Sequence, residues 1–481
     1  MPLSPCSVQT NTVEQFLSYF LIHLRSSISN EPPVRGNINH GGGISHTALN
    51  IMEEQQTRAL KMIQYAVKFS TAIQDGTSYQ AMPSSSQLWT SFPFCRALTF
   101  IIERGTSTIV LKMFCIPVTP EAGQITILAD TAVVDATPSA KTWKDLPNFD
   151  DLPMFKNMKG CAWEVWGKDD QLGTINLLTD EVVKKAAAEE IITGTTVSLN
   201  WPLQFPSKPL FGRKSPEVNM ILKSPRVVRD DEIHINTQSG TQWDGLRHFG
   251  LQEHGVFYNN TPQDAMESGI VPIHDPLAID PALAHIGIQN WANHGICGRG
   301  VLLDIVRYYS GELDGTGSPG LTELPYDPWT THGLTVAELE ACAEKQGVKF
   351  RQGDILILRV GFIRKYQNAT QEARDALAAR PETFAGIEQS EDMKRFLWNN
   401  HFAAIASDQP ALEVRWPTGE GTPHMHQTLL GLWGMPIGEM FDVEQLSQVC
   451  AKMGRYTFFF SSWPLAIIGG CASPPNAAAY F

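Results

Sequence analysis

The sequence predicts an α/β domain over residues 151–481, preceded by an N-terminal segment, residues 1–150, whose fold it does not predict. Three observations support this division. The chain has 481 residues, 43% of them hydrophobic, which is enough for one or two domains with at least one large core. From about Leu146, dense apolar runs separated by Gly and Pro replace a less regular texture. Strand-like and helix-like patterns then alternate, which is typical of an α/β or α+β domain.

The first elements of the predicted domain have clear local signals. Residues 180–191 (DEVVKKAAAEEI) favour a helix, and Thr179 before them is a good N-cap. Residues 195–203 (TTVSLNWPL) are rich in β-formers. Residues 300–306 (GVLLDIV) and 354–362 (DILILRVGF) are short, β-branched and bounded by Gly, so they predict buried strands.

The later elements follow the same alternation. Residues 334–348 (LTVAELEACAEKQGV) predict a helix with Thr335 near its cap and Gly347 at its end. Residues 390–401 (SEDMKRFLWNNH) predict another helix, and the strand-like FAAIAS, residues 402–407, follows it. No internal repeat is visible.

The N-terminal segment contains polar, turn-rich stretches at residues 36–43 (GNINHGGG) and 83–87 (PSSSQ), and part of it is expected to be disordered. The apolar residues 16–24 are not followed by a small-residue cleavage site and make a poor signal peptide. Residues 97–118 are apolar but interrupted by charges, so they do not provide the roughly 20 apolar residues of a membrane span. We therefore expect a cytoplasmic protein that binds no membrane.

Charge and cysteine content exclude two further classes. The formal net charge of −13 argues against nucleic-acid binding, which depends on clustered Lys and Arg. The eight cysteines lie far apart without a CxxC pair, as expected for reduced thiols and not for a disulfide framework or a structural zinc site. The sequence also has no GxGxxG that opens a βαβ unit and no Walker A or GxSxG motif, which argues against nucleotide cofactors and serine hydrolase chemistry.

One polar stretch, TQSGTQWDGLRHFG at residues 237–250, has the spacing of a metal site. If it is extended, Gln238, Gln242 and Asp244 lie on one face, because even spacings share a side of a strand. Gly245 permits a turn that brings His248 near the same point. From these residues alone, a polar loop with a hydrogen-bonded aspartate is the favoured interpretation.

A second candidate cluster lies at residues 423–441, where His424, His426 and Glu439 surround an apolar run. A lone histidine in such a run is often a core residue. Between the two clusters, Asp408 ends the strand-like stretch in IASDQPALE, residues 405–413. Acidic residues at strand ends occur in α/β active sites, although solvated turns also place them there.

Together these segments resemble the cyclase-like family of metal-dependent hydrolases, which includes bacterial kynurenine formamidase and isatin hydrolase. The family motif is H-x-G-T-H-x-D-x-P-x-H, and residues 238–248 (QSGTQWDGLRH) match it with three departures, which are Gln238 and Gln242 in place of the first two histidines and Leu246 in place of the proline. Other segments follow in the family's order over about residues 160–481: WGKDDQLGTINLLT, GVLLDIV, GDILILRVGF, IASDQPALE, the HQTLLG and PIGE segments, and GGCASPPNAAA. The resemblance implies a mixed β-sheet with flanking helices, of the swivelling β/β/α type, and a homo-oligomer in which a neighbouring subunit adds residues to the site.

The resemblance also implies roles for individual residues. Asp244 matches the metal-binding aspartate, and His248 matches the histidine that acts as general acid/base. His426 and Glu439 match the later residues that complete the site, with Glu439 as a metal ligand or as a residue that orients water. Gln238 and Gln242 replace the two motif histidines and would be amide ligands. The catalytic set is thus His248, Asp244 and Glu439, and the metal set is Asp244, Gln238, Gln242, His426 and Glu439.

The two glutamines bear on the cofactor. An imidazole nitrogen is a strong ligand for Zn²⁺ or Mn²⁺, whereas an amide oxygen is a weaker and harder donor. A divalent metal, Mn²⁺ or Zn²⁺, is therefore expected to bind more weakly than in the rest of the family. Both replacements keep polarity and hydrogen-bonding capacity, while Asp244 and His248 are retained, which favours a remodelled catalytic site over a lost one.

Three functions follow from these observations. The first is hydrolysis of an amide, lactam or ester bond in a small cyclic or aromatic molecule, as in an arylformamidase of tryptophan catabolism or secondary metabolism. The second is a lyase, isomerase or cyclase reaction that needs little or no metal. The third is binding of a small molecule without catalysis. Trp243 and Trp433 are candidates for an aromatic wall of the pocket, although core packing is the favoured interpretation for either one taken singly.

Overall fold

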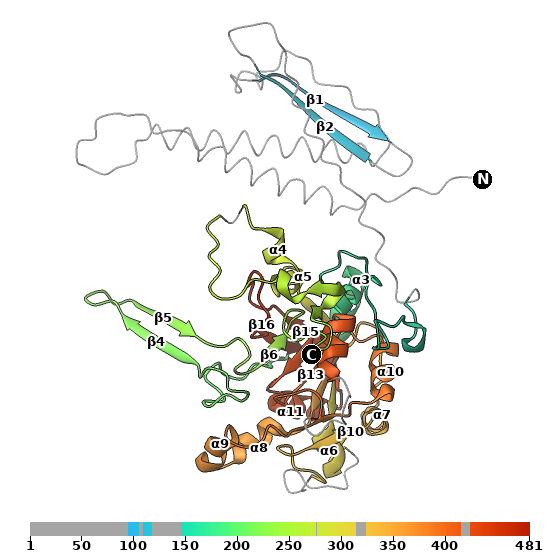
Figure 1. Cartoon of the computed structure of the whole chain (residues 1–481), viewed down its shortest axis with the longest axis vertical. Helices are drawn as coiled ribbons and strands as arrows, with labels where there is room; N and C mark the ends of the chain where they lie inside the picture. Colours follow the sequence, from blue (N-terminus) through green and yellow to red (C-terminus); the bar gives the residue numbers. More distant parts are fainter. Residues whose placement is uncertain (1–94, 105–108, 118–145, 276, 314–323, 415–423) are drawn as a thin grey trace. The chain divides into compact units, whose positions relative to one another are not determined.

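The computed structural model describes residues 146–275, 277–313, 324–414 and 424–481, together with the backbone of two strands nearer the N-terminus (Figure 1). The chain divides into two compact units, Met1–Asp135 and Ala136–Phe481. In the first unit, β1 (Cys95–Arg104) and β2 (Ile109–Pro117) form an antiparallel pair, so most of the apolar stretch at 97–118 is a hairpin. The turn-rich stretches and residues 16–24 lie outside the described residues. No helix in the described ranges has the length and apolar character needed to cross a membrane.

The second unit is built on a mixed sheet of nine strands, as predicted. Their order is β16 (Ala472–Ser473), β6 (Gln242–Asp244), β14 (Ile437–Glu439), β13 (Ala404–Ser407), β11 (Ile355–Arg359), β9 (Ile296–Asp304), β15 (Thr457–Ser462), β17 (Ala477–Tyr480) and β3 (Thr196–Ser198). The strands from β14 to β9 are parallel, and every other pairing is antiparallel. The carboxyl ends of four parallel strands therefore meet at one edge.

Two of the three predicted helices begin where the sequence places their caps, and the third begins directly after Ser390. Thr179 accepts a hydrogen bond from the backbone N–H of Val182 at the start of α3 (Asp180–Glu190). Thr335 and Glu338 form a capping box on α7 (Val336–Lys345). Ser390 caps α10 (Glu391–Asn399). The other α-helices are α4 (Pro281–Ala284), α5 (Gln289–His294), α6 (Ile305–Ser310), α8 (Phe362–Asn368), α9 (Gln371–Leu377) and α11 (Glu444–Met453).

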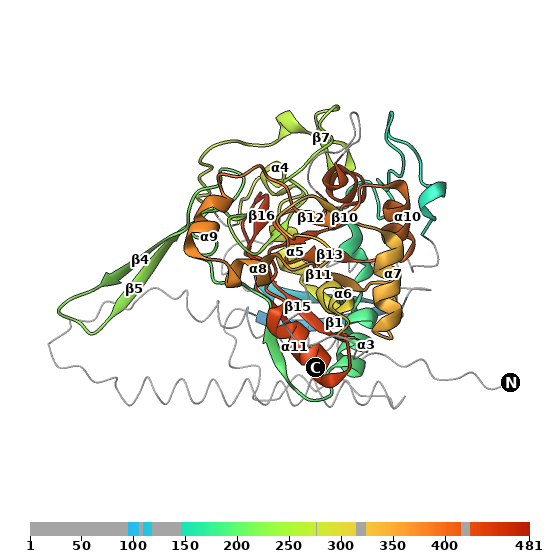
Figure 2. The same ribbon diagram turned by 90° about the horizontal axis from the view of Figure 1, so that it is seen from below.

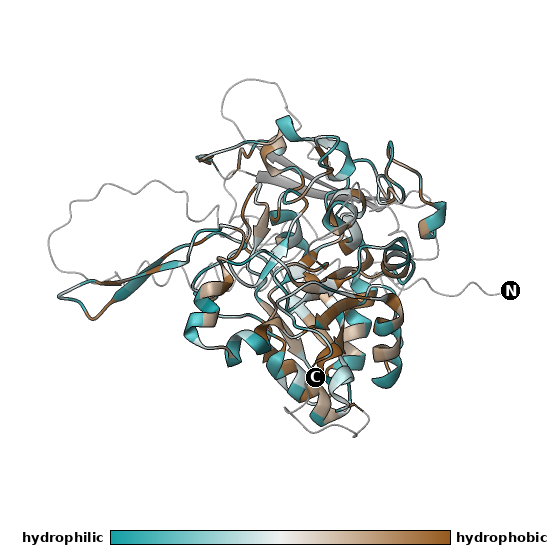
Figure 3. Ribbon diagram, turned by 60° about the horizontal axis from the view of Figure 1, so that its bottom comes forward, coloured by the Kyte–Doolittle hydropathy of each residue, from teal (hydrophilic) through white to brown (hydrophobic). Residues whose placement is uncertain are grey.

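Alternate residues of the central strands enter two separate cores, because successive side chains of a strand point to opposite faces. On one face, Leu303 of β9 and Leu356 of β11 pack with residues of α7 and α10. On the other, Leu302 and Ile357 pack with residues of α5 and α11. The hydropathy colouring shows the same layering, with apolar strands inside and polar outer surfaces on the helices (Figure 3). The sheet is thus a rigid support for groups at its edge.

Short elements complete the unit. The pair β4 (Glu217–Leu222) and β5 (Arg229–His234) forms a hairpin that projects from the domain (Figure 2). Two more two-stranded pairs are β7 (Val256–Phe257) with β8 (Thr261–Pro262), and β10 (His332–Leu334) with β12 (Ala385–Ile387). The single-turn helices are η3 (Phe149–Asp151), η4 (Gly173–Leu177), η5 (Tyr258–Asn260) and η6 (Gln263–Ala265). All five cysteines with described side chains are free thiols.

Candidate active site

The pairing of β6 with β14 brings the two sequence clusters together. These strands are antiparallel, and Gln242 lies opposite Glu439 while Asp244 lies opposite Ile437. Gln242 and Asp244 are both fully buried on the same face of β6. Trp243, between them, points to the opposite face, where its ring packs against Phe441. The alternation predicted from sequence thus places an amide and two carboxylates side by side.

The Gly-Thr step of the motif holds this strand in position. Gly240 lies so close to the backbone of Phe205 that a Cβ atom at Gly240 would be 2.6 Å from the carbonyl oxygen of Phe205. The Thr241 hydroxyl donates to the carbonyl oxygen of Met440 at 2.7 Å and accepts from the backbone N–H of Trp201 at 2.8 Å. Gly240 and Thr241 therefore fix where β6 lies, and the residues on either side of them form the site.

The two oxygens of Asp244 have different surroundings. Oδ1 accepts hydrogen bonds from Nε2 of Gln238 at 2.7 Å and from Nε2 of Gln242 at 3.1 Å. Oδ2 is buried and has no hydrogen-bond partner among the described residues. It faces Nε2 of His426 at 3.6 Å and Nε2 of His248 at 3.8 Å, just beyond hydrogen-bond distance. A buried carboxylate oxygen without a donor is costly unless another group pairs with it.

The two glutamines direct amide nitrogens at their neighbours. Nε2 of Gln242 also donates to Oε2 of Glu439 at 2.8 Å, and its Oε1 accepts from Nη1 of Arg213 at 3.5 Å. Nε2 of Gln238 lies 3.1 Å from Nδ1 of His248. Both amides therefore act as donors to the predicted catalytic residues, and a metal bond to either would need its oxygen turned inward.

His426 enters the site from the start of a short helical segment. It is the N-cap residue of η7 (Gln427–Trp433), a π-helix, which is a form often found at functional positions. Its Nδ1 lies 2.6 Å from Oε2 of Glu413, and its Nε2 lies 3.3 Å from Oε1 of Glu439. The ring is thus held by one carboxylate and directed at two others.

Burial and neighbouring charges set the pKa values of these groups. Burial raises the pKa of Asp244, but the charges of His248 and His426 outweigh it and bring the pKa to about 2. Burial and the charge of Asp244 raise the pKa of Glu439 to about 7. Burial lowers the pKa of His248. It also opposes the charge on His426, yet the carboxylate of Glu413 and the other two acids hold the pKa of His426 well above its ordinary value.

The residues present fit a divalent cation. One ligand atom each from Asp244, His248 and His426 can be chosen so that all three lie within 4.8 Å of one another. The unpartnered Oδ2 of Asp244 lies 3.6 Å from Nε2 of His426 and 3.8 Å from Nε2 of His248, and carboxylate and imidazole groups are usual ligands of Zn²⁺ or Mn²⁺. Glu413 holds the far nitrogen of His426, as carboxylates commonly hold metal-binding histidines. The geometry thus supports a cation at the Oδ2 side of Asp244.

Two site residues were not singled out from the sequence. Glu413 ends the segment IASDQPALE, and its place behind His426 depends on how residues 405–413 pass β14. Arg213 precedes the projecting hairpin and donates from Nη1 to the carbonyl oxygen of Gln238 at 2.6 Å. Neither position carries a local pattern that marks it as functional. The one signal in the sequence is that Glu413 carries a carboxylate 13 residues before the candidate histidine His426.

Three other candidates lie outside this cluster. Trp243 and Trp433 are fully buried in the two cores, and their ring N–H groups bond Ser462 and the carbonyl oxygen of Gly160. They are core residues, so the aromatic-wall hypothesis is wrong. Asp408 is buried and accepts the backbone N–H groups of Val360 and Gly361, so it is neither a solvated turn residue nor part of the site. The aromatic ring near the imidazoles is Phe249, 5.4 Å from His426 between ring centroids.

Comparison with known proteins assigns the family. The chain matches the family model described as putative cyclase over residues 195–414. A crystal structure described as a novel cyclase shares 31% sequence identity, with a TM-score of 0.55, over 67% of this chain and 99% of that chain. The chain belongs to the cyclase family. The family resemblance inferred from the motif order is therefore confirmed.

Other structures similar to this cyclase-family chain are more distant. An isatin hydrolase bound to the product analogue thioisatinate shares 15% identity over 62% of this chain and 94% of its own, with a TM-score of 0.39. Isatin hydrolase A from Ralstonia solanacearum shares 17% sequence identity over 59% of this chain and 91% of its own, with a TM-score of 0.37. Scores this low do not establish a common activity. The comparison with curated proteins gives no match.

Proposed function

We propose that this cyclase-family chain is an enzyme that hydrolyses an amide, lactam or ester bond of a small cyclic or aromatic molecule. The observation that carries the proposal is the buried, unpartnered Oδ2 of Asp244 between two imidazoles. A protein interior seldom leaves a carboxylate oxygen without a partner, and such an exception commonly marks a functional site.

Each residue has a role in this proposal. Asp244 and His426 hold a divalent cation, with Glu439 beside them, and Glu413 keeps His426 in place. When bound, the cation supplies Lewis-acid polarisation of the scissile carbonyl. His248 acts on the substrate from Nε2 in proton transfer or hydrogen bonding. In the net reaction, the oxygen of water bonds to the carbonyl carbon, the C–N or C–O bond breaks, and the leaving atom takes a proton.

The second candidate is a lyase, isomerase or cyclase reaction without a cation. It is favoured by the amide donors, which satisfy Oδ1 of Asp244 and Oε2 of Glu439 without a metal. Glu439, whose pKa is raised to about 7, is well placed for proton transfer near neutral pH. The homo-oligomer implied by the family resemblance stays a prediction.

Isotope labelling separates the two reactions. The purified chain would be incubated in H₂¹⁸O with aryl formamides, lactams and aryl esters, with and without Mn²⁺ or Zn²⁺. The masses of the products would be measured by mass spectrometry. Hydrolysis places one ¹⁸O atom in the acid product, and this activity should disappear in His248→Ala. Turnover without ¹⁸O incorporation would support the lyase or isomerase reaction instead. If no substrate of the panel reacts while a ligand still binds at the site, the non-catalytic alternative gains support.

A further inference from the structure

The orientation of the Gln238 amide follows from its neighbour. The atom of Gln238 that lies 2.7 Å from Oδ1 of Asp244 is Nε2. An ionised carboxylate only accepts hydrogen bonds, so a nitrogen must face it. Turning the amide over would place Oε1 against Oδ1, with two acceptors in repulsive contact. The position of Asp244 thus determines which end of Gln238 faces the site.

The same nitrogen then determines where His248 carries its proton. Nε2 of Gln238 has two hydrogens, and its second neighbour is Nδ1 of His248 at 3.1 Å. Because the amide donates, Nδ1 must offer its lone pair. A neutral imidazole has one N–H, so the proton of His248 lies on Nε2, the nitrogen that faces Oδ2 of Asp244.

The other imidazole has the opposite arrangement. Both oxygens of Glu413 lie within 2.8 Å of Nδ1 of His426, and a carboxylate accepts. Nδ1 of His426 therefore carries a hydrogen, and its Nε2 is the nitrogen that can offer a lone pair to a cation. An amide behind one ring and a carboxylate behind the other thus give two neighbouring histidines different chemical roles.

We propose that Gln238 is a positioning residue that holds His248 as a neutral Nε2–H donor toward the reacting carbonyl oxygen, and so keeps His248 out of the metal ligand set. The inference rests on the proposed function, for which it assigns His248 the donor role. The developing negative charge on that oxygen strengthens the hydrogen bond during the reaction. The remaining ligands, on the Oδ2 side of Asp244, are Asp244 itself, Nε2 of His426 and Glu439.

Histidine-selective ¹⁵N labelling of the full chain tests this directly. Two-bond ¹H–¹⁵N spectra distinguish the tautomers, and loss of one ring's signals in His248→Gln assigns His248. We expect the Nε2–H tautomer in the wild-type chain. Gln238→Leu, which removes the donor, should shift His248 toward a mixture with Nδ1–H, and Gln238→Glu, which supplies an acceptor, should place a proton on Nδ1. Gln252→Leu makes the same change at an exposed glutamine and should leave the His248 signals unchanged.

Addition of Zn²⁺ provides the second readout. The Nε2 resonance of His426 should move to a metal-bound position, while His248 keeps its Nε2–H signal. An Nδ1–H tautomer in the wild-type chain, or a zinc-bound Nε2 on His248, would overturn the proposal. The tautomer is read without substrate, so it is independent of turnover: an Nε2–H result in a chain that hydrolyses nothing refutes only the proposed function. Hydrolysis by a chain with the other tautomer refutes only the role given to Gln238.

Discussion

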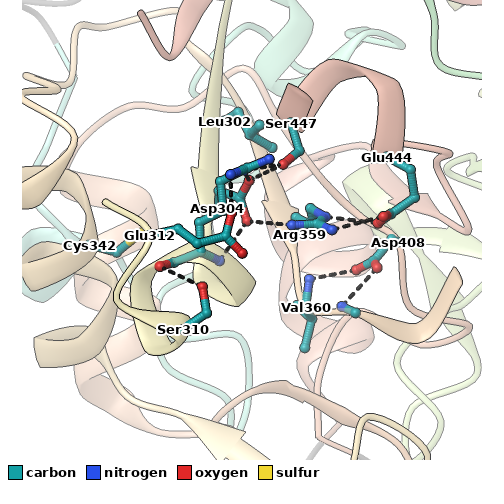
Figure 4. A network of polar contacts seen from close by, with 12 residues as sticks. Leu302, Asp304, Ser310, Glu312, Cys342, Arg359, Val360, Asp408, Glu444 and Ser447 are labelled. Atoms are coloured by element: carbon teal, nitrogen blue, oxygen red, sulfur yellow. Dashed lines mark hydrogen bonds and ion pairs between the residues drawn. The ribbon is translucent and has the colours of Figure 1, made fainter. Parts of the chain in front are cut away.

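Two groups of buried polar residues lie in the second unit, and they differ in how completely their atoms are paired. The first, which we call the ion network, consists of Asp304, Arg359, Glu444 and Ser447 (Figure 4). Oδ1 of Asp304 accepts from Nη1 of Arg359 at 3.0 Å, and Oδ2 accepts from the Ser447 hydroxyl. Arg359 uses its other two nitrogens on Glu444, both at 2.8 Å.

The second group is the candidate site, where β6 pairs with β14. There, Asp244 is as deeply buried as Asp304, but only Oδ1 has donors, and Oδ2 has none among the described residues. A fully paired network gains nothing from a ligand and ties strands together, whereas an unpaired oxygen can bind a cation or a substrate group. Burial of charge is therefore common to both groups, and incomplete pairing is what distinguishes the candidate site.

The largest expected effect is at Asp244. Asp244→Asn keeps the size of the side chain and removes the charge that faces both imidazoles. We expect kcat/KM to fall by about 10³-fold or more with thermal stability largely retained, because acid/base and cation-binding groups contribute on this scale. Steady-state kinetics and thermal unfolding on the same preparations measure both quantities. Full activity in Asp244→Asn would show that the unpaired oxygen has no catalytic role.

The matching change in the ion network should affect stability instead. Asp304→Asn leaves Arg359 buried with one partner fewer, and removing one member of a buried pair costs about 3–5 kcal/mol. Urea unfolding should show this loss in the free energy of unfolding, while kcat/KM per folded molecule stays within a few-fold of wild type. A 10³-fold loss of activity without loss of stability would contradict the comparison.

Asp408, which lies close to the ion network, predicts a pH dependence of stability. Its burial raises its pKa from 3.8 to about 7. Between about pH 4 and pH 7 the folded chain holds a proton that the unfolded chain has lost, so this residue's contribution to stability decreases as pH rises through that window, by about 4 kcal/mol at most. The free energy of unfolding at pH 5 and pH 8 should differ less in Asp408→Asn than in wild type. If the free energy of unfolding changes equally between pH 5 and pH 8 in both proteins, Asp408 does not have this role.

The smallest expected effect is at Glu413, behind the site. Glu413→Gln keeps an acceptor for His426 but removes the charge, and loss of such a supporting carboxylate typically lowers metal affinity about 10–100-fold. Calorimetric titration with Zn²⁺ measures the change, and Glu340→Gln at an exposed position is the control. If both variants bind zinc as the wild type does, Glu413 does not support a metal ligand.

Much of the fold could be predicted because its signals are local. The helices α3, α7 and α10 begin at cap residues that are visible in the sequence, and β9 and β11 are apolar runs of strand length. The strands β15 and β17 were not among the predicted elements, and their pairing with each other and of β15 with β9 places them in the sheet.

The site was predictable only where the motif carries it. Even spacing placed Gln242 and Asp244 on one face, and the family order pointed to His426 and Glu439. The direction in which each amide points depends on acceptors from β14 and on Asp244, so no spacing reveals that the glutamines are donors. The supporting position of Glu413 is likewise revealed only by its contact with His426, which lies 13 residues later in the chain.

Zinc titration of three proteins tests most directly whether incomplete pairing marks the functional site. Calorimetry on wild type, Asp244→Asn and Asp304→Asn compares the unpaired buried carboxylate with the paired one. The expected result is one Zn²⁺ per chain for wild type and for folded Asp304→Asn, and at least a 100-fold weaker interaction for Asp244→Asn. Equal zinc affinity in Asp244→Asn and wild type would contradict the assignment of the site to the unpaired oxygen of Asp244.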